Sequence, residues 1–136
     1  MNKLGSLGLI LLFSIVSVSA AAANFDGSQP LLCTSVEVYD CEPGGNCIRG
    51  LADDINAPEF IFLDFKKSVA RTTRASGEER TAKIGTPTQE NGRLILHGVQ
   101  RGVGWSLAIV QETGHMTLTL VGSEVAIVIF GACTPV

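Results

Sequence analysis

Four cysteines are the residues of this chain whose type and spacing most clearly predict chemistry. Cys33, Cys41, Cys47 and Cys133 follow one another at separations of eight, six and eighty-six positions. A four-cysteine zinc site needs two close pairs, and a thioredoxin-type redox motif needs two cysteines with two residues between them. Neither spacing occurs here, so the even cysteine count in a small chain predicts structural disulfides.

The stretch DCEPGGNCI predicts one of these disulfides. Proline and two glycines between Cys41 and Cys47 let the chain turn back, which brings the two Cα atoms within the roughly 7 Å that a disulfide allows. Cys33 and Cys133 would then bond to each other, which fits a closed barrel whose first and last strands are neighbours. Four cysteines allow three pairings, and the sequence by itself does not exclude the other two.

A basic stretch is the second candidate site. Six Lys and Arg side chains gather within residues 66–83, namely Lys66, Lys67, Arg71, Arg74, Arg80 and Lys83. Such a cluster could bind an anionic envelope surface such as lipopolysaccharide or peptidoglycan. The alternative is a solvated loop whose charge is balanced by Glu78 and Glu79. We take Lys66, Lys67, Arg71 and Arg74 as possible binding residues.

Trp105, the single tryptophan of the chain, is the third candidate. It stands in phase with the apolar Leu107 and Ile109, which favours a core position, although it could also stack on a sugar or close a ligand cavity. His97 alternates in phase with two apolar neighbours, and this predicts a buried histidine. His115 follows a turn glycine and is expected to be exposed.

Motifs for enzymatic chemistry are missing from the sequence. There is no G-x-S-x-G elbow, P-loop, H-E-x-x-H or paired-carboxylate arrangement. No nucleophile, base and orienting group can be assembled from the remaining residues. We therefore expect a protein that is not an enzyme, with no catalytic residue, no metal and no cofactor.

Residues 1–23 have the three-part layout of a secretory signal peptide. A positive start is followed by an apolar run and then by a stretch of small residues that ends at Ala23. Cleavage there predicts a periplasmic or secreted protein of residues 24–136 that is not inserted in a membrane. This part of the chain carries nine Lys and Arg against thirteen Asp and Glu, and the net charge of minus four argues against nucleic acid as a partner.

The elements that must position these residues are predicted to be strands. Strand-like segments between turn signals predict strands at 32–39, 59–67, 80–88, 93–100, 105–111, 115–121 and 124–131. The segments at 105–111 and 115–121 alternate between an apolar and a more polar face, whereas the last segment is apolar on both faces, which predicts that it is covered on both sides. Asn91-Gly92 favours a type I′ hairpin turn. Short links force neighbouring strands to be antiparallel. We predict one all-β domain at 24–136, an up-and-down meander of about seven to eight strands in a closed or nearly closed barrel, with a two-sheet sandwich as the alternative.

Two resemblances add to these expectations. The segments FDGSQPLLC, GWSLAIVQETGHMTLTL and FGACTP resemble a family of small exported proteobacterial proteins of unknown function, which implies the location and the fold but no activity. RASGEER is also similar to the inhibitory loop of periplasmic inhibitors of C-type lysozyme, and it matches their motif at Ala75, Ser76 and Gly77. That resemblance implies a protein partner and adds Ser76 to the possible binding residues.

Three functions follow as expectations. The first is a binding module for an envelope component or a small apolar ligand, and the second is an inhibitor of a secreted hydrolase such as lysozyme that acts through the loop at 71–80. The third is a structural envelope protein with no dedicated ligand. A cavity reached by solvent would favour the first function, and a packed interior with a protruding ordered loop would favour the second. The partner is accordingly an envelope component, a small ligand or a secreted protein, and we expect a monomer.

Overall fold

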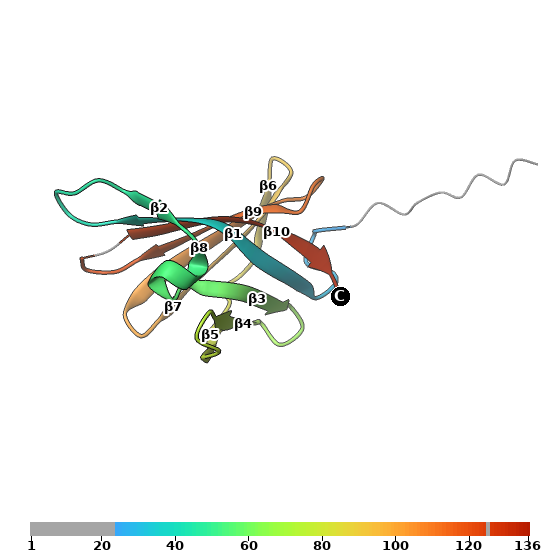
Figure 1. Ribbon diagram of the computed structural model, residues 1–136. Helices are drawn as coiled ribbons and strands as arrows, with labels where there is room; N and C mark the ends of the chain where they lie inside the picture. The colour runs from blue at the N-terminus through green and yellow to red at the C-terminus, as the bar shows by residue number, and fades with distance from the viewer. Residues whose placement is uncertain (1–23, 125) are drawn as a thin grey trace, which may run out of the picture.

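The computed structural model describes residues 24–124 and 126–136, so the predicted signal peptide at 1–23 lies outside the described part of the chain (Figure 1). The described residues form ten strands and one short 3-10 helix. The strands are β1 (Leu31–Cys41), β2 (Ile48–Gly50), β3 (Pro58–Asp64), β4 (Val69–Arg74), β5 (Glu79–Lys83), β6 (Thr88–Glu90), β7 (Arg93–Gln100), β8 (Val103–Val110), β9 (His115–Val121) and β10 (Ala126–Pro135), and the helix η1 (Ala52–Ile55) precedes β3.

All ten strands belong to one antiparallel sheet. Nine of them follow the order β5-β4-β3-β1-β10-β9-β8-β7-β6, and β2 pairs with β1 alone. The sheet curves into an open half-barrel (Figure 1). The predicted all-β antiparallel fold is confirmed, but the predicted closed barrel of seven to eight strands is wrong. The two-sheet alternative is wrong as well, because the strands form a single sheet.

The half-barrel is open where β5 and β7 approach each other without forming a ladder of backbone hydrogen bonds. Only single hydrogen bonds cross this gap in the described structure: Gly85 N donates to His97 O at 2.8 Å, and Gln100 Nε2 donates to Thr81 O at 2.6 Å. The strand predicted at 80–88 is interrupted between β5 and β6, because Pro87 has no N–H to donate to a ladder. Closure fails at this interruption.

Two tight hairpin turns connect the strands on this side of the sheet. Asn91 and Gly92, between β6 and β7, have φ of 48° and 73°, as a type I′ turn requires and as the sequence predicts. Arg101 and Gly102 take nearly the same values, 49° and 79°, between β7 and β8. The turn at Arg101-Gly102 joins β7 to β8, where Leu94 pairs with Ile109 and Gly98 pairs with Trp105.

The core is formed by inward-facing side chains of both arms of the half-barrel. Its fully buried members include Leu31, Leu63, Leu94, Leu96, Leu107, Ile109 and Ile129. Leu94 and Leu96 occupy the inner face of β7, so His97 lies on the outer face and is exposed. The predicted burial of His97 is wrong, because the apolar residues on both faces of β7 made the two faces hard to tell apart.

Both predicted disulfides are present. Cys33 and Cys133 lie opposite each other in the β1–β10 pair, with their Cα atoms 3.9 Å apart, and Cys41 bonds to Cys47 across a six-residue separation. The reason for the first pair differs from the expected one. β1 and β10 are neighbours near the middle of the sheet order, and the seam that would close a barrel lies elsewhere, between β5 and β7.

The segment predicted as a loop at 71–80 is a hairpin. Residues 71–74 belong to β4 and residues 79–80 to β5, so only residues 75–78 form a turn. Gly77 takes a φ of 83° there, and its N–H donates to Arg74 O at 2.8 Å. β4 was not predicted from the sequence, because both faces of this strand carry polar residues from Arg71 onward.

Candidate ligand-binding cavity

A cavity of about 200 Å³ lies inside the half-barrel and is partly open to solvent. Its lining comes from both arms: β3, β4 and β5 on one side, and β7, β8 and β9 on the other. The two arms meet at the gap in the sheet, where Arg80 and Ala82 of β5 face Gln100, Arg101 and Val103 of the β7–β8 hairpin. The cavity therefore lies between the two arms, next to the gap in the sheet.

The floor of the cavity is apolar. Leu63, Leu107 and Leu118 are 0 %, 1 % and 5 % exposed and form its deepest lining, together with Ile61 and Ala70. They point inward because strand side chains alternate between the two faces of the sheet. An apolar floor without charged groups suits a ligand body that cannot form hydrogen bonds.

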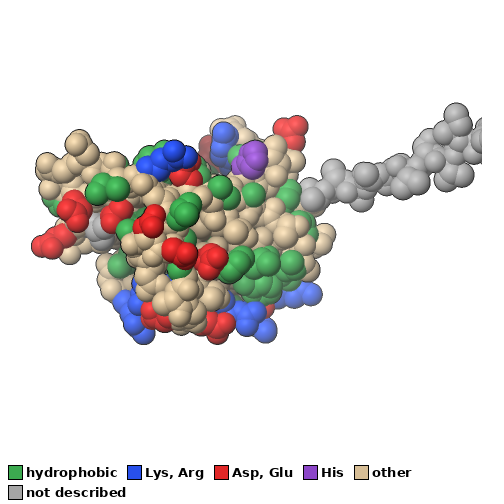
Figure 2. Space-filling view, in the orientation of Figure 1, with side chains coloured by type: hydrophobic (Ala, Val, Ile, Leu, Met, Phe, Trp, Pro, Cys, Tyr) green, Lys and Arg blue, Asp and Glu red, His purple; other side chains and the backbone are tan. Residues whose placement is uncertain are grey.

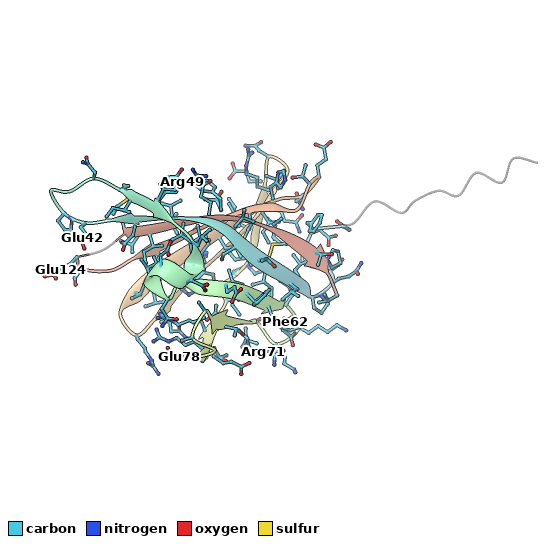
Figure 3. All side chains as sticks on the ribbon, in the orientation of Figure 1. Glu42, Arg49, Phe62, Arg71, Glu78 and Glu124 are labelled. Carbon is cyan, nitrogen blue, oxygen red and sulfur yellow. A yellow bond between two sulfur atoms is a disulfide. The ribbon has the colours of Figure 1, made fainter. Side chains whose placement is uncertain are left out.

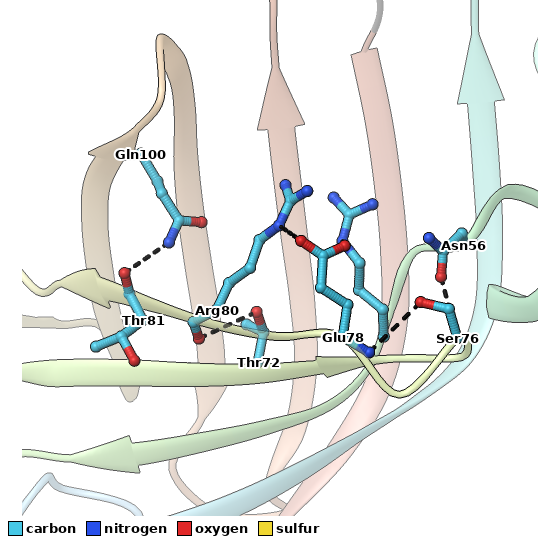
Figure 4. Close-up of polar contacts among 8 residues, drawn as sticks. Asn56, Thr72, Ser76, Glu78, Arg80, Thr81 and Gln100 are labelled. Carbon is cyan, nitrogen blue, oxygen red and sulfur yellow. Dashed lines mark hydrogen bonds and ion pairs between the residues drawn. The ribbon is translucent and has the colours of Figure 1, made fainter.

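The rim of the cavity is polar and rich in arginine. Arg74 and Arg80 project from the β4–β5 hairpin on the same face as Thr72, and each is about a quarter exposed. Arg80 Nε donates to Glu78 Oε1 at 2.8 Å (Figure 4). Arg74 Nε lies 3.8 Å from Glu78 Oε2. The hydrogen bond from Arg80 and the nearby arginine charges hold the pKa of Glu78 below its ordinary value of 4.5.

Two buried donors line the cavity without a hydrogen-bond partner among the described residues. They are Trp105 Nε1 and Arg74 Nε. Room for the indole comes from Gly98, which lies opposite Trp105 in the β7–β8 pair. A Cβ atom at Gly98 would stand 2.5 Å from Trp105 Cζ2 and 2.5 Å from Lys83 O. An unpaired buried donor is costly, so these two groups are the strongest chemical signal of the site.

Two of the residues proposed from the sequence, Arg74 and Trp105, thus lie at this cavity. The other four lie elsewhere. Lys66 and Lys67 are exposed in the β3–β4 turn, where Lys67 Nζ is 3.6 Å from Asp64 Oδ2, and Ser76 lies at the tip of the β4–β5 turn. Arg71 points to the outer face, where its guanidinium carbon stands 4.6 Å from the ring centroid of Phe62 (Figure 3).

The predicted basic cluster is therefore not one patch. The strand alternation of β4 sends Arg71 and Arg74 to opposite faces of the sheet. Figure 2 shows Lys and Arg side chains interspersed with Asp and Glu along the edge where β4 and β5 lie. This mixture gives little concentrated positive charge on the outside of the molecule. The sequence did not reveal Arg80, Gln100 or Arg101 as lining residues, because they meet only across the gap.

Other features of the described residues give weaker indications of a functional site. A shallow hollow on the outer face, beside Val36 and Phe130, is wide and open to solvent. No cluster of three or more His, Cys, Asp or Glu side chains in the described ranges could hold a metal ion. Those ranges also contain no helix with the length and apolar character needed to cross a membrane.

Comparisons with protein-family models, with curated proteins and with solved structures found no match for this chain. The cavity's shape and its lining chemistry are therefore the grounds for a functional proposal.

Proposed function

We propose that this protein is a non-enzymatic binding module that holds a small, mainly apolar ligand in the half-barrel cavity. The observation that carries the proposal is an apolar floor of Leu63, Leu107 and Leu118 beneath a partly open mouth. A dry, apolar cavity of about 150 Å³ is known to take up one benzene molecule. A cavity of about 200 Å³ suits a ligand body of that size or slightly larger.

The proposal includes the location of the protein. Export through the segment at 1–23 would place residues 24–136 in the periplasm or outside the cell, where an oxidising environment allows disulfides to form. Two disulfides and no free cysteine among the described residues fit such a compartment. The ligand would then be a small molecule of the cell envelope or its surroundings, bound by a monomer.

A titration with 1-octanol tests the proposal. The backbone amide resonances of a ¹⁵N-labelled sample of residues 24–136 are followed by nuclear magnetic resonance. We expect saturable shifts at Leu107 and Leu118 and at the indole N–H of Trp105, with little change at Leu31 and Leu94. Shifts of similar size over the whole protein, or none at all, would refute ligand binding in the cavity.

A cavity-filling variant sharpens this test. Ala82 lines the cavity from β5, so Ala82→Leu should occupy part of its volume and abolish the saturable shifts. Thr81→Leu adds a similar side chain to the same strand on the exposed face and serves as the control. Equal binding by both variants would show that octanol binds somewhere else.

The alternative function, inhibition of a secreted hydrolase, would use the turn at 75–78. Ser76, Gly77 and Glu78 in this turn are exposed. A hydrogen bond from Ser76 N to Asn56 Oδ1, at 3.1 Å, holds the turn against the rest of the molecule (Figure 4). An open cavity favours the ligand-binding module over the inhibitor, for which a packed interior would be expected. Loss of C-type lysozyme activity on addition of the protein, and its recovery with Ser76→Lys, would reverse that preference.

A further inference from the structure

We infer that the ligand is an anionic amphiphile, with an apolar chain or ring on the cavity floor and a carboxylate or phosphate-monoester head bound by Arg74 beside Trp105. This inference rests on the proposed function, because it names the chemistry of the ligand for the same cavity. It follows from the unpaired donors, from the charge of the rim and from the separation of polar rim and apolar floor.

The unpaired donors call for an acceptor that the described residues do not supply. Trp105 Nε1 and Arg74 Nε are both buried and both line the cavity. An indole N–H can only donate, and a guanidinium group has five N–H donors and no acceptor. A ligand oxygen at the rim would satisfy donors of both kinds, and a purely hydrocarbon ligand would satisfy neither.

The charge of the rim favours an acidic oxygen over a neutral one. Three arginines, Arg74, Arg80 and Arg101, line the cavity, and no Asp or Glu does so among the described residues. Glu78 stands next to this set and is shared between Arg74 and Arg80. One carboxylate against three guanidinium groups leaves an excess of positive charge, although residues 24–136 as a whole carry a net charge of minus four.

Of the two arginines of the β4–β5 hairpin, Arg74 is the better placed to bind a new anion. Arg80 already donates to Glu78 at 2.8 Å, whereas Arg74 Nε is 3.8 Å from the same carboxylate, beyond hydrogen-bond distance. Arginine binds carboxylate and phosphate through paired N–H groups, and such charge-assisted bonds are about twice as strong as neutral ones. Glu78 would compete with the ligand head for Arg74, so its charge should weaken binding.

The test compares octanoate, octyl phosphate and 1-octanol, which share one chain and differ in the head group. Binding is measured at pH 7 by isothermal titration calorimetry, and the site is located by the backbone amide resonances of Leu107 and Leu118. We expect octanoate or octyl phosphate to bind at least about tenfold more tightly than 1-octanol, as one charge-assisted hydrogen bond would give. The stronger of the two anions identifies the head group as carboxylate or phosphate.

Variants of rim residues test which side chains cause the preference for an anionic head group over 1-octanol. Arg74→Gln should remove most of the preference for the anion, so that octanoate and 1-octanol bind this variant with similar affinity. Arg71→Gln, which removes the same charge from the outer face of the same strand, should leave the preference intact. Trp105→Phe removes the indole donor as well as some apolar area, and the loss of the donor should weaken anion binding more than octanol binding.

A variant that is expected to strengthen binding separates the inference from simple loss of folding, because a misfolded variant would bind more weakly. Glu78→Gln should strengthen octanoate binding by about threefold or more, because the competing carboxylate is gone, and Glu79→Gln should not. Equal affinity for octanoate and 1-octanol, or weaker octanoate binding by Glu78→Gln, would overturn the inference while the proposed function stands. Failure of all three probes to bind would overturn the proposed function itself.

Discussion

The two ends of the half-barrel are built from the same strands and differ in how fully they are packed. On β8, Ile109 is 0 % exposed, whereas Trp105, four residues earlier on the same face, is only partly buried and has a donor without a partner among the described residues. On β4, Ala70 is buried and Arg74 is not. We call the end around Leu31, Leu94 and Ile109 the packed end, and the end around Arg74 and Trp105 the open end.

The difference shows how one sheet can separate stability from binding. At the packed end, Phe25, Met116 and the Cys33–Cys133 disulfide complete the core around Leu94 and Ile109. At the open end, the gap between β5 and β7 leaves space and unpaired polar groups. Tight packing stabilises the fold, and incomplete packing at a solvent-reachable end leaves room for a ligand.

The disulfides provide the largest expected effect. Replacing Cys33 and Cys133 by serine removes a link across 100 residues at the packed end, which the chain-entropy model values at about 4 to 5 kcal/mol. Replacing Cys41 and Cys47 by serine removes a link across six residues at the edge of the molecule, for which the same model gives roughly 2 kcal/mol. Urea unfolding of the two double variants measures both values, and a larger loss for the second variant would contradict the assignment of stability to the packed end.

Truncation of one leucine at each end gives the next largest effect. Leu94 is 0 % exposed, so Leu94→Ala should lower the free energy of unfolding by about 2 to 5 kcal/mol. Leu120 already borders the cavity and is only partly buried, so Leu120→Ala should cost clearly less, about 1 to 2 kcal/mol. Equal losses in chemical denaturation would mean that the open end is packed as tightly as the other.

Trp105→Phe should have a smaller effect on stability than its size suggests. The variant removes apolar area, but it also removes a buried N–H that has no partner among the described residues. Leaving such a donor unpaired costs about 1 to 3 kcal/mol, which offsets most of the lost packing. We expect the free energy of unfolding to change by less than about 1 kcal/mol. A loss of about 3 kcal/mol or more, as for a core aromatic residue, would mean that Trp105 stabilises the fold as much as a residue of the packed end does.

Replacing Glu78 should have the smallest effect on the free energy of unfolding, and this effect should depend on pH. Its pKa in the folded protein is lowered by the hydrogen bond from Arg80 and by the charges of Arg80, Arg74 and Arg101. A lowered pKa means that the carboxylate stabilises the fold above its ordinary pKa of 4.5 and that this contribution disappears as the pH falls through the lowered value.

The wild-type protein should therefore have a slightly higher urea midpoint than Glu78→Gln at pH 7, and the difference should decline as the pH falls below 4.5 and through the lowered pKa of Glu78. Glu79→Gln is the matched control and should show no such trend. A difference between wild type and Glu78→Gln that stays constant as the pH falls would show that the charge of Glu78 is not its cause.

Regular alternation explains which parts of the fold could be predicted from the sequence. Leu107 and Ile109 follow the small residues Ser106 and Ala108 on β8, and Met116 and Leu118 alternate with threonines on β9. The structure buries all four apolar residues as expected. The hairpin at Asn91-Gly92 was predictable because both residues tolerate positive φ. β4 was not, because Thr72 and Arg74 face inward at the open end, where polar inner residues hide the strand pattern.

The site was harder to predict than the fold because it depends on the gap. β5 and β7 form no ladder, and the segment between β5 and β6, which contains Gly85 and Pro87, interrupts a stretch that otherwise has strand character. Arg74 and Trp105 were candidates on residue type alone, but their position at one cavity depends on how two distant arms of the sheet curve together. A one-dimensional pattern has no information about the volume left between the arms.

The central claim is that the open end contains a ligand-accessible apolar cavity and the packed end does not. A crystal structure determined under xenon pressure tests this most directly, because xenon occupies dry apolar cavities. We predict xenon density beside Leu107 and Leu118, and none beside Leu94 and Ile109. Leu107 and Leu118 packed against the opposite arm, with no xenon between them, would contradict the claim.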